Sequence, residues 1–404
     1  MKLFFSVGEP SGDLHGANLI CELERKAGKV ETLGLGGPRM NAAGCRLLRD
    51  MTDLAIMGLV PALVKLPQFL WLLAQVEQSL KAERPDAVVL IDYPGFNWHV
   101  AKKAKALGIP VVYYGLPQLW AWLSWRVEKV RKYVDHPLCK LPFEEAWFRS
   151  QGCEATTYVG HPYFDELKAQ KLDEQFLAQF KSSSQRLVTI LPGSRRSEVQ
   201  RNFALQVKAA EIIRREVPDV RFAVASYNEQ QAAMAAKILG RSDFPITIIP
   251  KKTPELIHAA TCCLAVSGSV SLELLYHAKP TVLQYNLAMP TYYVMQQLVR
   301  VQYMTIPNLI TTPDLHPRRK QRYSRHSPVH DHVLFPEYPD WRDHSQDVAS
   351  HAIEWLQDEP GRLQLIHKLE QLRGSLAIGG ASANAADYIL RNVVQQTPAN
   401  SRAA

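Results

Sequence analysis

Leu3–Gly16 read LFFSVGEPSGDLHG: a short apolar run, then a glycine, then a turn of small and polar residues. The apolar run predicts a buried strand, and the pattern from Leu14 to Arg25 predicts a helix behind the turn. A strand, a glycine-containing turn and a helix in this order make a βα unit. The stretch therefore predicts an α/β fold built on parallel strands.

The same alternation of short apolar runs and helical patterns continues along the chain. Continuous apolar runs are typical of parallel strands that are buried on both faces. Further strands are expected at Ala87–Ile91, Val111–Tyr114, Leu187–Leu191, Arg221–Ala225, Ile246–Ile249, Cys262–Val266 and Thr281–Gln284. Helices are expected at His99–Leu107, Ala204–Arg215, Glu229–Ile238 and Val270–Leu275. Two doubly wound, Rossmann-like α/β domains with a cleft between them are the simplest architecture.

The length of 404 residues favours two domains, because a single hydrophobic core rarely organises more than about 300 residues. The sequence turns polar over Lys168–Gln185, where we expect the linker. We predict one domain over 1–165 and a second over 185–355, with C-terminal helices in 361–395 joining the first. Residues 310–345 are rich in Pro, His and Arg and show little periodicity, so we expect them to be functional or disordered.

The formal net charge is +8 and the pI is near 9.1. Such a charge favours nucleic acid, phosphorylated small molecules or an anionic membrane surface as partners. The basic residues are spread out except for a cluster at Pro317–Arg325 (PRRKQRYSR), and no nucleic-acid-binding signature accompanies them. No nucleic-acid partner is therefore predicted. The six cysteines form no CxxC pair and residues 1–7 are too short for an export signal, which indicates a cytoplasmic protein with reduced thiols.

The loop Gly8–Gly16 (GEPSGDLHG) lies between the first strand and the first helix. Backbone N–H groups and the helix dipole favour an anion or a polar sugar at such a place. Ser11 or Asp13 could instead only cap the helix, with the glycines as turn formers. The loop is not a GxGxxG motif, so no dinucleotide is inferred.

Asp92 follows the predicted strand Ala87–Ile91 and precedes Tyr93–Asn97 (YPGFN). The carboxyl ends of parallel strands face the crevice in which doubly wound folds bind ligands. A carboxylate at this place is a candidate general base. It could equally be an acid that only caps the next helix.

Leu191–Arg195 (LPGSR) occupies the corresponding strand end in the second half. Gly193 and Ser194 expose backbone N–H groups, and the guanidinium of Arg195 can hold two phosphate oxygens at once. The loop therefore predicts a diphosphate site. An ordinary surface arginine is the alternative.

Ser267–Glu273 (SGSVSLE) is a second turn of small residues before a helix. Ser267, Gly268 and Ser269 are candidates for contacting phosphate, and Glu273 could accept both hydroxyls of a ribose. A plain turn with a capping box is the alternative. Together the two turns suggest a nucleotide diphosphate. No DxD pair appears where a divalent metal would be expected, so neither a metal nor another cofactor is predicted.

Two apolar stretches, Gly58–Leu73 and Leu116–Trp125, are unusual for a soluble enzyme. Neither is long and unbroken enough to span a bilayer, which needs about 20 apolar residues. They could be buried in the core. Alternatively, they could form an exposed apolar surface that contacts a membrane or an acyl chain.

Over nearly its whole length, the sequence resembles the lipid-A-disaccharide synthases. Ten motifs of the family occur in order: Gly8–Gly16, Gly36–Met40 (GGPRM), Met57-Gly58, Ile91–Asn97 (IDYPGFN), Pro117–Trp122 (PQLWAW), Leu141–Glu144 (LPFE), Gly160–Pro162 (GHP), Leu191–Glu198 (LPGSRRSE), Ser267–Glu273 and Pro307–Leu309 (PNL). So many ordered matches make a chance resemblance negligible.

The resemblance implies a GT-B glycosyltransferase of lipid A, and hence lipopolysaccharide, biosynthesis. The second domain would hold UDP-2,3-diacylglucosamine, and the first would hold the acceptor, 2,3-diacylglucosamine 1-phosphate (lipid X). Transfer with inversion would form the β(1→6) disaccharide 1-phosphate and release UDP. The enzyme would be cytoplasmic and peripheral on the inner membrane.

The resemblance also implies roles for single residues. Asp92 is the expected base for the acceptor 6-hydroxyl, with His15 or Asp13 as the next candidates. One displacement inverts the sugar, so one base suffices. Contacts to the acceptor are expected from Glu9, Ser11 and Gly12. Contacts to the UDP-sugar are expected from Gly193, Ser194, Arg195, Ser267, Gly268, Ser269, Glu273 and Asn308.

The chain departs from the family pattern in two places. Many members carry a second aspartate where this sequence has Gly95, which removes an alternative base. Between Asn308 and Glu337, where the family usually has a short connection, this chain has the extended segment rich in Pro, His and Arg. The UDP contacts expected from Asn308 and Glu337 are weakened accordingly.

Other functions share some of these features. A UDP-N-acetylglucosamine 2-epimerase or a peptidoglycan-precursor glycosyltransferase has the same type of turn before Glu273, but the GEPSGD loop argues against both. A lipid carrier of two lobes without catalysis would suit the apolar stretches.

Overall fold

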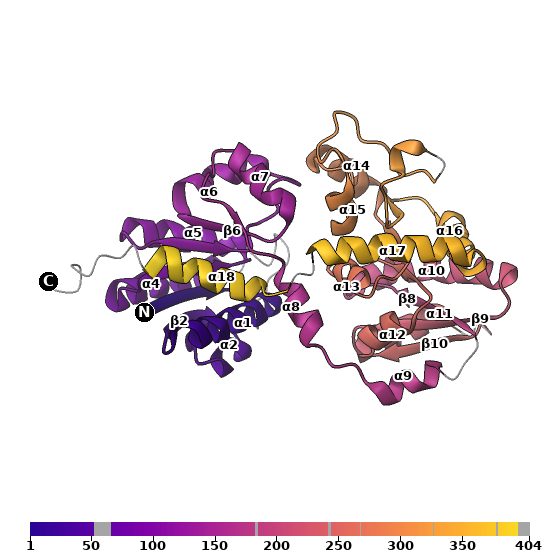
Figure 1. The fold of residues 1–404 in the computed structure, drawn as a ribbon, viewed down its shortest axis with the longest axis horizontal. Helices are drawn as coiled ribbons and strands as arrows, with labels where there is room; N and C mark the ends of the chain where they lie inside the picture. Colours follow the sequence, from indigo (N-terminus) through magenta and orange to yellow (C-terminus); the bar gives the residue numbers. More distant parts are fainter. Residues whose placement is uncertain are drawn as a thin grey trace. The chain divides into compact units, whose positions relative to one another are not determined.

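The computed structural model describes residues 1–51, 66–181, 185–240, 244–266, 268–325, 327–376 and 379–394. The chain divides into two compact units, which Figure 1 shows in ribbon form. Unit 1 comprises Met1–Glu166 and Ile378–Ala404, and unit 2 comprises Leu167–Ala377. Each unit has its own parallel sheet among the described residues.

The described strands of unit 1 occur in the order β3-β2-β1-β4-β5-β6-β7. They are β1 (Lys2–Val7), β2 (Glu31–Gly36), β3 (Arg46–Asp50), β4 (Ala87–Ile91), β5 (Val111–Tyr114), β6 (His136–Cys139) and β7 (Thr157–Tyr158). Every residue of β4 is buried, because this central strand is covered on both faces. The strand order reverses between β1 and β4, which is the switch point where doubly wound folds bind ligands.

The described helices of unit 1 are α1 (Pro10–Ala27), α2 (Pro38–Ala42), α4 (Leu66–Glu83), α5 (Pro94–Ala106), α6 (Val127–Tyr133), α7 (Pro142–Ser150) and α18 (Ala381–Ile389), with the short turns η2 (Ser124–Arg126) and η4 (Leu390–Val394). α8 (Pro162–Ala169) begins in unit 1 and ends in unit 2. α1 begins at Pro10 rather than Leu14, because a proline suits the first turn of a helix, where its missing N–H is not needed.

α18 completes the core of unit 1. Ala385, Ala386 and Ile389 of this helix are buried in the same apolar cluster as Leu19 and Ile20 of α1. In Figure 1, the yellow α18 lies beside the indigo α1, although the two come from distant parts of the chain. Unit 1 is therefore built from two separate stretches of sequence.

The carboxylate of Asp165 holds the start of α18. Its Oδ1 accepts hydrogen bonds from the N–H groups of Gly380 (2.6 Å) and Ala381 (3.2 Å), and its Oδ2 accepts one from Ser382 (3.0 Å). The first N–H groups of a helix have no partner within the helix, so an external carboxylate stabilises them.

The described strands of unit 2 occur in the order β10-β9-β8-β11-β12-β13. They are β8 (Arg186–Leu191), β9 (Val220–Ser226), β10 (Ile246–Pro250), β11 (Cys262–Ala265), β12 (Thr281–Asn286) and β13 (Glu337–Asp340). The order reverses between β8 and β11, so unit 2 has its own switch point.

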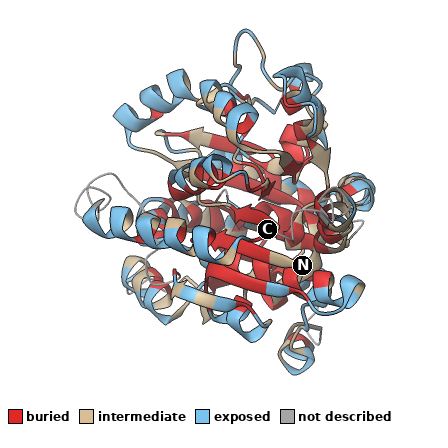
Figure 2. Ribbon diagram, turned by 90° about the vertical axis from the view of Figure 1, so that its left-hand side faces the viewer, coloured by how far each residue is buried: buried red, intermediate tan, exposed pale blue. Residues whose placement is uncertain are grey.

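The described helices of unit 2 are α9 (Glu174–Lys181), α10 (Arg196–Glu216), α11 (Glu229–Leu239), α12 (Thr253–Ala259), α13 (Val270–Tyr276), α14 (Met289–Leu298), α15 (Ile306–Thr311), α16 (Ser345–Gln357) and α17 (Glu359–Leu376), with the short turn η3 (Pro328–His330). Phe203 of α10, Val224 of β9 and Trp355 of α16 belong to its apolar core. Figure 2 shows the burial pattern: the strands are mostly buried, and the outward helix faces are exposed.

The domain boundaries differ from the sequence expectation. α17 belongs to unit 2, so the expected return of 361–395 to the first domain applies only after residue 377. The expected linker Lys168–Gln185 contains α9, which contacts α12 of unit 2. Within 310–345, the strand β13 adds an edge to the sheet next to β12, although its sequence EYPD has no apolar alternation. Among the described residues, no helix is long and apolar enough to cross a membrane.

Candidate active site

The switch point of unit 1 brings together the two loops that the sequence analysis selected. β1 pairs in parallel with β4, with Val7 opposite Ile91. The next residues, Gly8 and Asp92, therefore leave the sheet side by side at its carboxyl edge. A Cβ atom on Gly8 would lie 2.3 Å from the ring of Tyr93, so only glycine allows the two loops to approach this closely.

The backbone at Asp92 is strained. Asp92 has a φ of 47° and Tyr93 a φ of 45°, in the left-handed region that is unfavourable for residues other than glycine. The carbonyl oxygen of Asp92 accepts hydrogen bonds from Asn97 Nδ2 (2.8 Å) and the Tyr113 hydroxyl (2.8 Å), which stabilise this conformation. Strained residues cluster at functional sites, so the strain supports a functional role for this turn.

Lys140 is the partner of the Asp92 carboxylate. Its Nζ lies 3.0 Å from Asp92 Oδ1, and the two side chains are 18% and 26% exposed. Burial alone would lower the pKa of Lys140, but the charges of Asp92, Glu144 and Glu9 outweigh it, and the pKa is raised. No described residue donates a hydrogen bond to Asp92 Oδ2. Lys140 thus binds one oxygen of the carboxylate, and the other oxygen has no donor among the described residues.

Glu144 of α7 positions Lys140. Its Oε2 accepts hydrogen bonds from the N–H groups of Lys140 and Leu141, both at 2.9 Å, and its Oε1 accepts one from Trp120 Nε1 at 2.8 Å. Burial raises the pKa of Glu144, while these hydrogen bonds act against the rise. The PQLWAW and LPFE motifs therefore meet in one buried contact behind Lys140.

His15 is buried in α1, and its side chain pairs with Glu166 rather than with Asp92. Its Nδ1 is 3.0 Å from Glu166 Oε1 of α8, and no hydrogen bond joins it to Asp92 among the described residues. Burial lowers the pKa of nearby His161 well below its usual range, and the charges of Lys140 and His15 act in the same direction. His161 of the GHP motif therefore lies within reach of the charges of both Lys140 and His15.

Asp13 has a structural environment that argues against the proton-transfer role considered for it. It is 2% exposed, and its Oδ1 accepts hydrogen bonds from the N–H groups of Gly37 (2.8 Å) and Met40 (3.1 Å). Its Oδ2 accepts one from Arg39 at 3.0 Å. The carboxylate therefore caps the start of α2, because these N–H groups have no partner within that helix.

The three residues expected to contact the acceptor lie in different environments. Ser11 is exposed in the first turn of α1, and Glu9 is half-buried just before it. A Cβ atom on Gly12 would lie 2.8 Å from Val7 Cγ1, so this glycine serves the packing of α1 against β1. Of the three, Ser11 has the most accessible side chain.

The apolar stretch Leu116–Trp125 has both a buried and an exposed part. Leu119 and Trp120 are buried, whereas Trp122 and Trp125 are exposed. The two interpretations offered from the sequence therefore apply to different residues of the same stretch.

The first half of the other apolar stretch, Gly58–Leu73, lies outside the described residues, which resume at residue 66. In its described part, Leu70 and Trp71 are exposed and Leu72 is buried. This end of the stretch therefore also has residues of both kinds.

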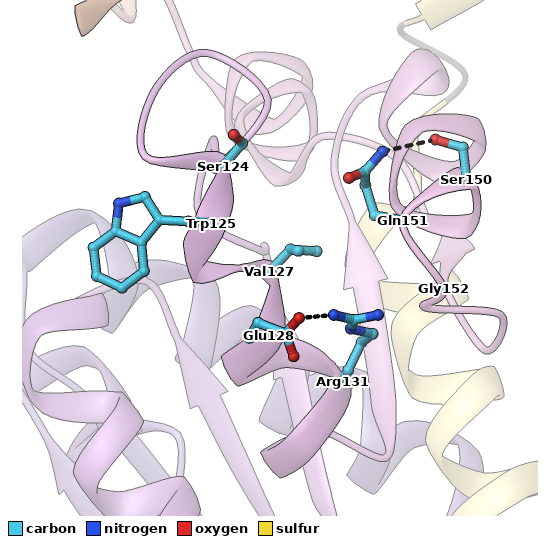
Figure 3. Close-up of a pocket in the computed structure, with 8 residues that line it drawn as sticks. All are labelled: Ser124, Trp125, Val127, Glu128, Arg131, Ser150, Gln151 and Gly152. Carbon is cyan, nitrogen blue, oxygen red and sulfur yellow. Dashed lines mark hydrogen bonds and ion pairs between the residues drawn. The ribbon is translucent and has the colours of Figure 1, made fainter.

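A shallow hollow of about 570 Å³ adjoins Trp125 (Figure 3). In it, Arg131 pairs with Glu128, and Gln151 donates to Ser150 Oγ at 3.3 Å. The hollow is lined by Ser124, Trp125, Val127, Glu128, Arg131, Ser150, Gln151 and Gly152. None of these is a ligand residue expected from the sequence, so the hollow is not assigned to the active site.

The switch point of unit 2 brings together the two turns expected to bind UDP. β8 pairs in parallel with β11, with Leu191 opposite Ala265. The loop that contains Gly193 and the turn that contains Gly268 therefore start at the same edge of the sheet. Ser267 itself lies outside the described residues.

The loop after β8 is organised by Glu198 of α10. Glu198 Oε2 accepts hydrogen bonds from the N–H groups of Ser194 and Arg195, both at 3.1 Å. The N–H group of Ser194, which was expected to be exposed for phosphate together with that of Gly193, is therefore occupied by Glu198. A Cβ atom on Gly193, whose φ is 107°, would lie 2.6 Å from Glu198. Glycine is required here because the carboxylate comes so close.

The side chain of Arg195 is still a candidate to bind phosphate. It is exposed, and its Nη1 lies 3.1 Å from Glu198 Oε1. A guanidinium has several donors in a fixed plane, so one bond to Glu198 leaves others for an anion.

The turn before α13 has an open side. Gly268 and Ser269 are exposed, and a Cβ atom on Gly268 would meet no atom within 4 Å. Glu273 is buried within α13. The small residues therefore leave space at the sheet edge, as a ligand would require.

Asn308 does not offer a free polar atom to a ligand, in contrast to its expected role. Its Nδ2 donates to Phe335 O (2.7 Å) and Glu337 Oε2 (3.1 Å), and its Oδ1 accepts from the N–H groups of Leu334 and Phe335, both at 3.1 Å. An asparagine amide makes at most about four such bonds, so its capacity is used. Asn308 therefore positions the start of β13.

The comparisons with known proteins identify the family. A family model described as lipid-A-disaccharide synthetase matches residues 3–351. The lipid-A-disaccharide synthase of Trichlorobacter lovleyi is 30% identical over 395 residues, covering 98% of both chains. That of Geobacter metallireducens is 34% identical over 310 residues, covering 76% of this chain and 80% of the relative.

The chain belongs to the lipid-A-disaccharide synthase family. It is therefore a glycosyltransferase of lipid A biosynthesis, as the resemblance of its motifs predicted.

Solved structures place this chain in a wider fold group. A UDP-GlcNAc 2-epimerase from Neisseria meningitidis bound to UDP-GlcNAc has a TM-score of 0.63 at 13% identity, covering 97% of this chain and 100% of that one. The calicheamicin glycosyltransferase CalG4 has a TM-score of 0.57 at 14% identity, covering 98% and 99%. Such low identities show the fold alone, and the prediction of a GT-B fold is confirmed.

Several residues that shape the site were missed in the sequence analysis. Asn97, Glu144 and Glu198 stand inside motifs that were recognised, but their hydrogen bonds follow only from the folded arrangement. Lys140 directly precedes the LPFE motif, and this position is the one feature of the sequence that could have indicated a role for it in the site. Among the described residues, no group of three or more His, Cys, Asp and Glu side chains could hold a metal ion.

Proposed function

We propose that this chain transfers the acylated glucosamine of UDP-2,3-diacylglucosamine to the 6-hydroxyl of 2,3-diacylglucosamine 1-phosphate (lipid X). The products are the β(1→6) disaccharide 1-phosphate and UDP. The family membership supports this choice of substrates. The observation that carries the chemistry is the Asp92 carboxylate, which is held by Lys140 at the switch point of unit 1.

In the proposed reaction, Asp92 Oδ2 accepts the proton of the acceptor 6-hydroxyl. The acceptor oxygen then bonds to C1 of the donor sugar while the bond from C1 to the UDP phosphate oxygen breaks. The electron pair of that bond leaves with UDP. A single displacement inverts the configuration at C1, so no covalent intermediate with the protein is needed. Lys140 orients the carboxylate through Oδ1.

We propose unit 2 as the UDP-sugar site, with Arg195 as its main anion ligand. Its guanidinium would stabilise the negative charge that develops on UDP as the sugar leaves. The open turn at Gly268 and Ser269 leaves room for the nucleotide. The description of the Neisseria meningitidis epimerase as bound to UDP-GlcNAc supports a UDP-sugar site on this type of scaffold.

We propose a cytoplasmic location with peripheral contact to the inner face of the cytoplasmic membrane. Both proposed substrates have acyl chains, and the net charge of +8 favours an anionic surface.

The decisive experiment is incubation with both acylated substrates, followed by mass analysis of the products. We expect disaccharide 1-phosphate and UDP from the wild type, and a rate lower by a factor of about 100 to 10,000 from Asp92→Asn. Asp135→Asn is the matched control. Asp135 also pairs with a lysine, Lys105, at 2.6 Å, but it lies directly before β6, at the end of the sheet where the strands begin, whereas Asp92 lies where β4 ends. Undiminished transfer by Asp92→Asn would refute the role of Asp92. An epimerised UDP-sugar without disaccharide would refute the proposed reaction.

A further inference from the structure

α14 presents an apolar surface to solvent. Tyr292 is the one fully buried residue of this helix. Val294 and Leu298 lie four residues apart and therefore share a side of the helix. Five apolar or aromatic side chains, here called the α14 face, are between 42% and 55% exposed: Met289, Tyr293, Val294, Met295 and Leu298. Single exposed apolar residues are ordinary, but five of them on one short helix indicate a contact surface.

The basic cluster found in the sequence lies against this helix. Lys320 Nζ donates to the carbonyl oxygens of Gln296 (2.7 Å) and Val299 (2.8 Å), at the C-terminal end of α14. Arg322 Nε donates to the Tyr292 hydroxyl at 3.1 Å. These bonds hold the loop beside α14, so the cluster and the apolar helix form one continuous surface.

The charge on this surface is positive. Arg318 and Arg319 precede Lys320 and are exposed, and Arg300 is exposed directly after the helix. Residues 288–300 contain no Asp or Glu. We call Arg318–Lys320 the basic loop.

We propose that the α14 face and the basic loop dock this protein on an anionic lipid bilayer. Apolar side chains flanked by arginines match the interface of such a bilayer, where acyl chains lie below phosphate headgroups. The absence of acidic residues from 288–300 and the flanking arginines favour this occupant over a second copy of a chain that is itself basic. This inference rests on the peripheral membrane contact proposed above, and it assigns that contact to the α14 face and the basic loop.

Flotation of the full chain with vesicles tests the proposal. Vesicles of phosphatidylglycerol and phosphatidylcholine are compared with vesicles of phosphatidylcholine alone, at low salt. We expect Val294→Ser with Leu298→Ser to lower the partition coefficient onto the anionic vesicles by about tenfold or more. Leu363→Ser, which changes an exposed leucine of α17 in the same unit, is expected to bind like the wild type.

Arg318→Glu with Arg319→Glu tests the charged part of the surface. We expect this variant to lose the preference for anionic vesicles, because its two arginines no longer attract phosphate groups. Thermal unfolding of every variant checks that the fold is retained; all the changed side chains are exposed.

Three results would overturn the proposal. One is wild-type flotation by the Val294→Ser, Leu298→Ser variant. Another is loss of flotation only when Leu70 and Trp71 of α4 are changed to serine, which would place the contact on unit 1. The third is a change of oligomeric state in size-exclusion chromatography with unchanged flotation. Transfer measured in detergent micelles is a separate readout, so failure of the proposed reaction is distinguished from failure of the docking surface.

Discussion

Replacing Asp13 with asparagine should destabilise unit 1 while leaving the chemistry intact. The carboxylate accepts hydrogen bonds from three N–H groups at the start of α2. One of them, from the N–H of Arg39 at 3.0 Å, goes to Oδ2, and the other two go to Oδ1. In asparagine, an NH₂ group replaces Oδ2. This group is itself a hydrogen-bond donor, so it cannot accept the hydrogen bond from the Arg39 N–H. A hydrogen bond to a charged acceptor contributes about 1.5–3 kcal/mol. Because Asp13 is 2% exposed, water does not replace the lost bond readily, and we expect a loss of about 2–3 kcal/mol.

Amide hydrogen exchange is the suitable assay, because a chain of two units need not unfold in one step. Peptides that cover Gly37–Met40 should exchange faster in the Asp13→Asn variant. Asp165→Asn is the matched control, since Asp165 binds three N–H groups at the start of α18 in the same pattern. Asp165 is partly exposed, so its loss should be smaller.

Transfer activity decides between the two roles of Asp13. If the side chain only caps α2, the folded variant should transfer sugar within a few-fold of the wild type. Unchanged exchange together with a rate at least about 100-fold lower would show that Asp13 acts in the reaction, and our assignment would be wrong.

Three further predictions concern single positions. Gly95→Asp should change stability by less than about 0.5 kcal/mol in thermal unfolding, because a Cβ atom there meets nothing within 4 Å; a larger loss would contradict the open space. Gly8→Ala should cost about 1–3 kcal/mol and slow transfer, because its Cβ would lie 2.3 Å from the Tyr93 ring; a neutral result would show that the turn can shift. Burial raises the pKa of Glu337 from its usual 4.5 to about 7 in the folded protein, so the folded state binds the proton more tightly than the unfolded state. The stability that this proton contributes is therefore lost as the pH rises from about 4.5 through 7. Over that range, the wild type should lose about 3 kcal/mol relative to Glu337→Gln in denaturant unfolding, and parallel pH curves would refute the shift.

Much of the fold could be predicted from the sequence because buried parallel strands are short apolar runs. β4 and β5 have the predicted bounds, since both are apolar throughout and end at polar or glycine residues. Helix starts were predicted late, as in α1 and α5, because their first turns contain proline and polar residues rather than an apolar face. β13 was missed because its four residues depend on pairing with β12 rather than on their own pattern.

The candidate site was predictable in position but not in bonding. The sequence places Asp92 and Arg195 at strand ends, and parallel topology then brings each to a switch point. The sequence does not show which of the polar groups already have hydrogen-bond partners within the folded protein. Asp13 and Asn308 are polar residues within recognised motifs, but their side-chain atoms are bonded to backbone groups distant in sequence. Lys140 was missed because its contact with Asp92 joins residues 48 positions apart.

The packing of α18 on α1 has a consequence for biosynthesis. A ribosome delivers the N-terminal strands of unit 1 early, yet Ala385 and Ile389, which close their core, are made only after all of unit 2. Unit 2 is continuous in sequence and can fold while the first unit still exposes the apolar side of α1. The nascent chain therefore presents an unfinished surface while unit 2 is being made, and unit 1 can be completed only once α18 has been synthesised.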